Sequence, residues 1–150
     1  MNARRFIAAV VTALVLLSPA AASAATDVKS VNMGKGVQVW FEEDHTLPII
    51  SMTVAFPSGS GYDPANKPGL SAFATALLDE GAGPYSSEAF QAALSDRGIR
   101  LNATSDRDWM TVTLVTLKDN AKDAFHLLGV ALASPHFDND AIARVRAQIL

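Results

Sequence analysis

The alternation of apolar and polar residues between positions 50 and 56 is the pattern that most restricts the fold of this chain. Four large apolar side chains alternate there with three small or polar ones, in the order Ile50, Ser51, Met52, Thr53, Val54, Ala55, Phe56. Successive side chains of a strand point to opposite faces, so this spacing predicts a strand with one buried face. The chain must then supply more strands and a second layer to cover that face.

Further strands are predicted on both sides of this one. Extended runs at 28–33 and 37–42 are joined by Gly34-Lys35-Gly36, which predicts a hairpin. Runs at 100–105 and 109–116 predict two more strands. In the last of these, alternation places three apolar side chains on one face: Met110, Val112 and Leu114.

Helical patterns separate and follow these strands. Ser86 is a candidate N-cap for one helix, with Glu88 in its first turn and Gly98 after its end. Asp119 or Asn120 is expected to cap a helix that runs to about Ala133, and a last helix is expected to follow Asp138. This order of elements predicts the α+β class, with an antiparallel-dominated sheet and helices packed on one face.

The segment Gly69–Leu78 predicts a helix with two distinct faces. An apolar stripe that should be buried consists of Leu70, Phe73, Leu77 and Leu78. The other face carries Ala72, Thr75 and Ala76, whose spacing would allow two side chains one turn apart to share a metal ion. Alanine has no donor atom and a threonine hydroxyl is a poor zinc ligand, so this face is not expected to bind zinc alone.

Four motifs in order surround this helix. They are Pro57-Ser58-Gly59-Ser60-Gly61-Tyr62-Asp63-Pro64, Pro68-Gly69-Leu70, Gly98-Ile99-Arg100-Leu101-Asn102-Ala103-Thr104 and Ser134-Pro135-His136-Phe137. From about Val31 onward the chain resembles the amino-terminal domain of the insulinase/pitrilysin family of zinc metallopeptidases. The run from Leu77 to Gly83 resembles its zinc-less members in particular.

The resemblance implies a degenerate zinc site. Active relatives carry His-x-x-Glu-His after the Gly-Leu pair, and those positions fall on Ala72, Thr75 and Ala76. Their third ligand, a Glu, would fall just beyond Leu150. We therefore expect no catalytic residue, no metal ligand and no cofactor in this chain, with zinc held by a partner subunit. His45, His126 and His136 are not spaced as a helical zinc pair, and each is expected to be structural or solvated.

The resemblance also implies a peptide-binding strand. In active relatives the strand that matches Leu101, Asn102, Ala103 and Thr104 lies along the cleft, and substrate peptides add to its edge through backbone hydrogen bonds. This mode depends little on side chains, so it is expected to survive loss of the metal if the edge is open. The alternative is that the strand is purely structural or buried in a subunit interface.

The amino-terminal residues resemble a secretory signal. Arg4 and Arg5 precede an apolar run from Phe6 to Leu17, and Ala22-Ser23-Ala24 fits a signal-peptidase site. The apolar run is too short to span a bilayer. We expect residues 1–24 to be removed and residues 25–150 to form the amino-terminal insulinase-like domain, incomplete here because it is a fragment of a longer chain.

Charge and composition exclude some partners. The formal charge is −3, and removal of Arg4 and Arg5 with the signal changes it to −5, with no basic patch for nucleic acid. The chain has no Cys and hence no disulfide or thiolate metal site. After signal removal no membrane association is expected, and the periplasm is the expected location.

Three functions remain open on the sequence. The first is a non-catalytic subunit of a periplasmic insulinase-like zinc metallopeptidase, which forms a heterodimer with a His-x-x-Glu-His subunit and supports peptide binding and chamber assembly. The second is a free-standing pseudoenzyme of the envelope that binds unstructured peptides or proteins. The third, a protease with zinc ligands elsewhere, is disfavoured because a catalytic zinc needs three protein ligands. Peptidase activity is thus expected only with a catalytic partner.

Overall fold

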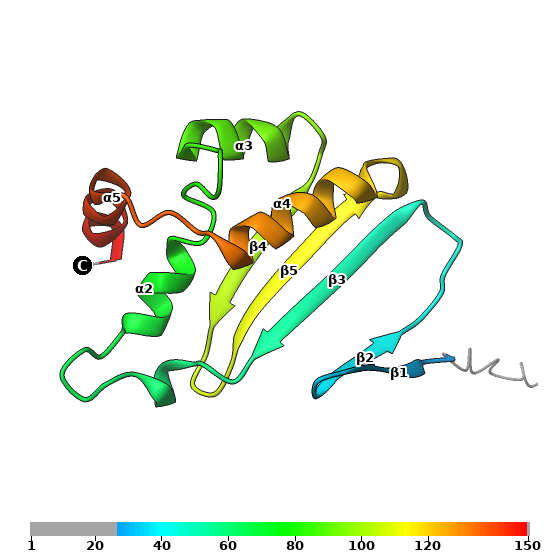
Figure 1. Ribbon diagram of the computed structural model, residues 1–150, viewed down its shortest axis with the longest axis horizontal. Helices are drawn as coiled ribbons and strands as arrows, with labels where there is room; N and C mark the ends of the chain where they lie inside the picture. The colour runs from blue at the N-terminus through cyan, green and yellow to red at the C-terminus, as the bar shows by residue number, and fades with distance from the viewer. Residues whose placement is uncertain (1–26, 150) are drawn as a thin grey trace, which may run out of the picture. The chain divides into compact units, whose positions relative to one another are not determined.

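The structure is a computed structural model that describes residues 27–149 (Figure 1). The predicted signal at 1–24 and the predicted mature start at Ala25 lie outside these residues. The chain divides into two compact units, residues 1–45 and 46–150, and each is described by itself. Within residues 27–149, every helix is too short or too polar to cross a bilayer.

The described part of the first unit is the predicted hairpin. Strands β1 (Lys29–Gly34) and β2 (Val37–Phe41) pair in antiparallel fashion, with Val31 opposite Val39. The turn requires the left-handed backbone region at three successive residues, with φ of 78° at Gly34, 52° at Lys35 and 80° at Gly36. Two glycines make such a turn inexpensive, because they lack the Cβ that disfavours positive φ.

The second unit is built on a three-stranded antiparallel sheet. Its strands are β3 (Ile49–Phe56), β4 (Arg100–Ser105) and β5 (Met110–Leu117), in the spatial order β3-β5-β4. The register places Leu101 of β4 and Met52 of β3 on either side of Leu114. All three strands lie where the alternating patterns predict them.

Four helices and two short 3-10 turns complete this unit. The helices are α2 (Leu70–Ala76), α3 (Ser87–Ser95), α4 (Ala121–Ala133) and α5 (Asn139–Ile149), and the turns are η1 (Ser60–Tyr62) and η2 (Lys118–Asn120). Helix α4 lies along the sheet and contacts β5, while α2 contacts β4 and α5 (Figure 1). The α+β class with an antiparallel sheet and packed helices is confirmed.

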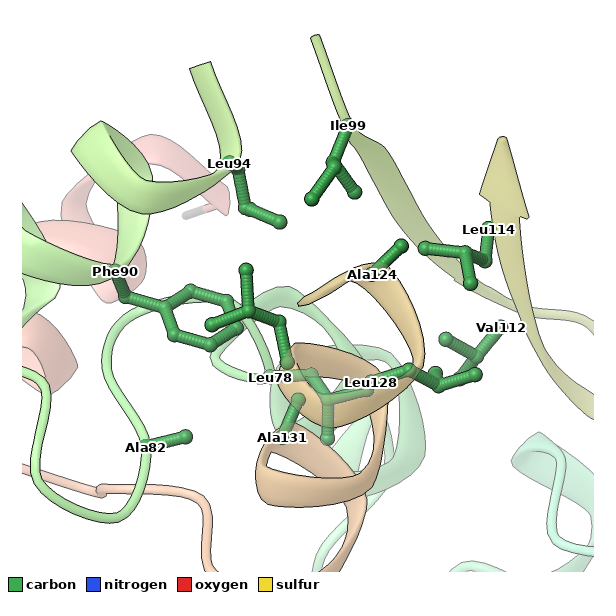
Figure 2. Close-up of a cluster of buried hydrophobic side chains, with 11 residues drawn as sticks. Leu78, Ala82, Phe90, Leu94, Ile99, Val112, Leu114, Ala124, Leu128 and Ala131 are labelled. Atoms are coloured by element: carbon green, nitrogen blue, oxygen red, sulfur yellow. The ribbon is translucent and has the colours of Figure 1, made fainter. Parts of the chain in front are cut away.

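The main core lies between the sheet and helices α3 and α4. Its buried members are Leu78, Ala82, Phe90, Leu94, Ile99, Val112, Leu114, Ala124, Leu127, Leu128 and Ala131 (Figure 2). Phe90, Val112 and Leu114 are fully buried. Two of the three apolar residues predicted on the inner face of β5 are thus at the centre of the core, and Met110 is half-buried at its margin.

The opposite face of the sheet carries threonine pairs at its centre and the exposed apolar pair Ile49 and Leu117 at one end. Hydroxyl pairs bridge its strands, with 3.1 Å between Thr53 Oγ1 and Thr113 Oγ1 and 2.7 Å between Thr104 Oγ1 and Thr111 Oγ1. Cross-strand threonine pairs satisfy each other and stay compatible with water, so the centre of this face needs no apolar cover.

A smaller core joins α2 to α5. Leu77, Ala141 and Val145 are buried there, with Phe73 and Ile142 packed against them. The predicted stripe is therefore only partly right, since Leu70 is 43% exposed. The helix also stops at Ala76, so Leu77 and Leu78 reach two different cores from the turn that follows it.

Helix starts agree with the predictions in part. Ser86 caps α3, because its hydroxyl accepts a hydrogen bond from the N–H of Ala89 at 3.3 Å. Asn120, one of the two predicted positions, is the N-cap residue of α4, but its side chain makes no capping bond and instead donates Nδ2 to the carbonyl of Arg97 at 2.7 Å. Helix α5 begins directly after Asp138, whose carbonyl accepts from the N–H of Ile142.

Candidate functional site

Helix α2 is positioned by a carboxylate that lies outside it. Gly69 precedes the helix with φ of 86° and has no side chain to cap it. The Asp63 carboxylate accepts the N–H groups of Gly69 and Ser71, both at 2.8 Å. Desolvation raises the pKa of Asp63, but the backbone bonds from Ser71 and Gly69 outweigh it and leave the pKa below its usual value. The loop is thereby tied to the first turn of the helix.

The three degenerate motif positions do not share one exposed face, contrary to the two-face description of the helix. Ala72 and Ala76 are exposed, whereas Thr75 is only 4% exposed. The hydroxyl of Thr75 donates to the carbonyl of Ser71 at 2.6 Å, so its polar group is satisfied within the helix. Two methyl groups and one inward-bonded hydroxyl do not fit a zinc ion, which needs nitrogen, sulfur or carboxylate donors.

None of the three histidines belongs to this helix. Within residues 27–149, no group of three or more His, Cys, Asp or Glu side chains is placed to hold a metal ion. His126 is exposed on α4. His136 Nε2 donates to the carbonyl of Gly83 at 2.9 Å, and its backbone N–H donates to Gly81 at 2.8 Å. His136 therefore fastens the segment between α4 and α5 to the loop that follows α2.

The residues predicted to bind peptide lie together on β4. In the part of the chain that the structure describes, β4 pairs only with β5 and is an edge of the sheet. Asn102 and Thr104 are exposed, while Leu101 and Ala103 are half-buried against the main core. Helix α2 contacts this strand, so the degenerate motif and the edge strand are neighbours (Figure 1). Whether peptides bind there stays a prediction.

The Gly-Ser loop before α2 docks on the turn between β4 and β5. Ser60 N–H donates to the carbonyl of Asp106 at 2.8 Å, and Gly61 N–H donates to that of Arg107 at 2.7 Å. A Cβ on Gly59 would lie 2.5 Å from the Asp106 oxygen, so the two backbones meet where no side chain fits. The Asp106 carboxylate shapes the turn, and the N–H groups of Trp109 and Asp108 lower its pKa.

The adjacent carboxylates after α2 point to different partners, as their spacing predicts. Asp79 accepts from Gln91 Nε2 at 3.1 Å. Glu80 accepts from Ser87 Oγ at 2.7 Å and forms an ion pair with Arg144. Glu80 thus links α3 and α5, which the sequence did not reveal.

A cavity of about 560 Å³ lies beside Glu80, between the start of α3 and α5. It is lined mainly by acidic and hydroxyl side chains. Neither the degenerate motif positions nor any residue of β4 lines it. This cavity is therefore separate from the candidate peptide site.

Two residues that position the site were missed on the sequence. Asp63 lies six residues before Gly69, too far for a standard N-cap pattern, so no local sequence signal reveals this contact. Gly59 is extended, with φ of −77° and ψ of −172°, so its need for glycine arises from a tertiary contact alone.

The fold and site together define a metallopeptidase-type domain in which the helix at the zinc-motif positions carries no zinc ligand. The family model for insulinase, peptidase family M16, matches residues 38–150. The chain belongs to this family.

Its relatives include proteins described as inactive. The Helicobacter pylori (strain ATCC 700392 / 26695) protein named "Non-peptidase homolog YmxG" is 30% identical over 122 residues, covering 81% of this chain and 28% of that protein. A solved peptidase M16 inactive domain from Pseudomonas fluorescens is 27% identical, with a TM-score of 0.76, covering 83% of this chain and 30% of that one. These descriptions agree with the absence of zinc ligands from α2.

A third comparison concerns the fold alone. A protease from Helicobacter pylori superposes with a TM-score of 0.70 at 20% identity, covering 82% of this chain and 30% of that one. The chain thus spans less than a third of the length of each of these three proteins.

Proposed function

We propose that this chain forms the amino-terminal part of a non-catalytic subunit of a periplasmic insulinase-like zinc metallopeptidase. The subunit pairs with a second one that carries His-x-x-Glu-His and zinc, closes the degradation chamber with it, and contributes β4 as a peptide-binding edge. The observation that carries this proposal is that the edge strand β4 contacts helix α2, whose three motif positions offer no zinc donor.

The retained geometry supports a binding role. Asp63 holds the start of α2, and the loop at Gly59 holds the turn beside β4, so both sides of the candidate site are fixed by several hydrogen bonds. Within residues 27–149 β4 has a strand partner on one side alone, so its other side has backbone groups with which a peptide can pair. Backbone pairing on β4 needs neither metal nor particular side chains.

The proposal of a periplasmic location is based on the signal-like residues 1–24. The proposal of a catalytic partner is based on the lack of zinc ligands on α2, because a family member without them needs a second subunit for hydrolysis. The full-length protein is expected to be inactive alone and to restore cleavage of an unstructured peptide when mixed with its zinc-motif subunit. A zinc-motif subunit that is fully active alone and does not associate with this protein would contradict the subunit role and favour the free-standing pseudoenzyme.

The strand is tested first with a modified peptide and then with variants of the protein. A peptide blocked at both ends should bind the full-length protein, and the same peptide with N-methyl groups on alternate amides should bind at least about tenfold more weakly, since it loses backbone donors worth about 0.5–1.5 kcal/mol each. Ala76→Trp, on the exposed part of α2, should weaken binding, whereas Ala92→Trp on the exposed surface of α3 is the matched control. Equal affinity of the two peptides would exclude edge pairing.

A further inference from the structure

A second, smaller cavity lies at the amino-terminal end of α2. Its volume is about 290 Å³, and its walls include the apolar side chains of Leu70, Phe73 and Ile149. Leu70 is 43% exposed, so within residues 27–149 the cavity is open to solvent beside an apolar wall. It lies on the Leu70–Phe73 side of the helix and includes none of the motif positions or β4 residues.

Two cations and no acid line this cavity. Lys67 and Arg146 are its charged residues. The Arg146 guanidinium lies 5.9 Å from the centroid of the Phe73 ring, a distance at which the ring face attracts a cation. Within residues 27–149, neither Lys67 nor Arg146 forms an ion pair with an Asp or Glu. In a chain with a net formal charge of −3, this is a local positive site beside an apolar surface.

We propose that this cavity binds the carboxyl terminus of a peptide that ends in a large apolar residue. The carboxylate pairs with Lys67 and Arg146, and the last side chain packs on Leu70 and Phe73. The volume favours this occupant, because 290 Å³ is at the lower limit of ligand pockets, about 300–1,000 Å³, and holds one terminal residue rather than a long acyl chain. The open side lets the rest of the peptide leave the cavity.

This inference rests on the peptide-binding role proposed above and adds a second, end-specific contact to it. A peptide blocked at both ends can pair with β4 but has no carboxylate for this cavity. Its binding therefore reports on β4 alone, and the two proposals fail separately.

The test measures binding of N-acetyl-Ala-Phe and of its carboxyl-terminal amide to the full-length protein by calorimetry. The acid should bind about tenfold more tightly than the amide, as two exposed ion pairs allow. Lys67→Met and Arg146→Met should each weaken binding of the acid about three- to fivefold and leave binding of the amide unchanged. Lys122→Met, an exposed site on α4 outside the cavity, is the charge control and should change neither.

Several outcomes would overturn the inference. Equal affinity for the acid and the amide would show that the carboxylate does not contribute to binding. Tighter binding of decanoate than of the peptide acid, reduced by the same two variants, assigns the cavity to a fatty acid. Failure of the acid to bind, while a doubly blocked peptide still binds, refutes the cavity as a carboxylate site and leaves the role of β4 intact.

Discussion

Replacing Gly59 by alanine should loosen the junction between the loop before α2 and the turn before β5. The added Cβ would lie 2.5, 2.6 and 2.7 Å from the Asp106 oxygen and from the carbon and oxygen of Arg107. All three are backbone atoms, so none can move aside as a flexible side chain would. The substitution must separate the two segments, even though the extended backbone of Gly59 suits any residue.

The cost follows from these contacts. Overpacking of this kind costs about 1–3 kcal/mol. Separation also weakens the hydrogen bonds from Ser60 and Gly61 to the turn, worth about 1 kcal/mol each. A total of about 2–4 kcal/mol is expected, which shifts the urea midpoint of the unit down by about 1–2 M at a typical dependence of about 2 kcal/mol per M.

Urea unfolding followed by circular dichroism measures this shift, with two glycines as controls. A Cβ on Gly61 approaches only one atom closely, the Arg107 oxygen at 2.9 Å, so Gly61→Ala should cost about 1 kcal/mol. A Cβ on Gly129 in α4 meets no atom within 4 Å, and Gly129→Ala should stabilise by about 0.5–1 kcal/mol. An unchanged midpoint for Gly59→Ala would refute the close approach and the positioning of α2 derived from it.

Three further predictions concern the same unit. Because the pKa of Asp63 is lowered in the folded state, the carboxylate's contribution to stability is present above the unfolded pKa of about 3.9 and is lost as pH falls through the folded pKa. Asp63→Asn should therefore remove part of the loss of melting temperature at acid pH, measured in a series of thermal melts. An unchanged series would count against the capping of α2 by Asp63. Phe90→Ala, at a fully buried ring, should cost about 3–5 kcal/mol in urea unfolding, and a loss below about 1 kcal/mol would mean that the ring is not in the core. Glu80→Gln should leave the sheet intact but release α5 to limited proteolysis, with the exposed Glu88→Gln as control; equal cleavage of both variants would show that the Arg144 pair does not hold α5.

Regular alternation and helical spacing predicted the framework well, since those patterns report which side chains are buried. The strands at Ile49–Phe56 and Met110–Leu117 lie where alternation placed them, because their inner faces pack on one core. The contact of β4 with α2 was not predicted and is seen only in the structure.

Features that depend on contacts between distant segments were not predictable from local patterns. Leu70 fits the apolar stripe but is 43% exposed, and the side chain of Asn120 at the predicted cap position donates to the Arg97 carbonyl 23 residues away instead of to the helix. The Thr75 side chain is buried, and its hydroxyl donates to the Ser71 carbonyl one turn earlier in the helix. The residue spacing alone does not reveal this hydrogen bond.

The central claim is that this family member has lost its own catalytic metal and depends on another subunit for hydrolysis. Its most direct test is elemental analysis of the purified full-length protein, combined with cleavage of an unstructured peptide by that protein alone and after addition of the His-x-x-Glu-His subunit. The account predicts zinc well below one ion per chain, no cleavage alone, and chelator-sensitive cleavage by the mixture. Stoichiometric zinc together with chelator-sensitive cleavage by the protein alone would contradict it.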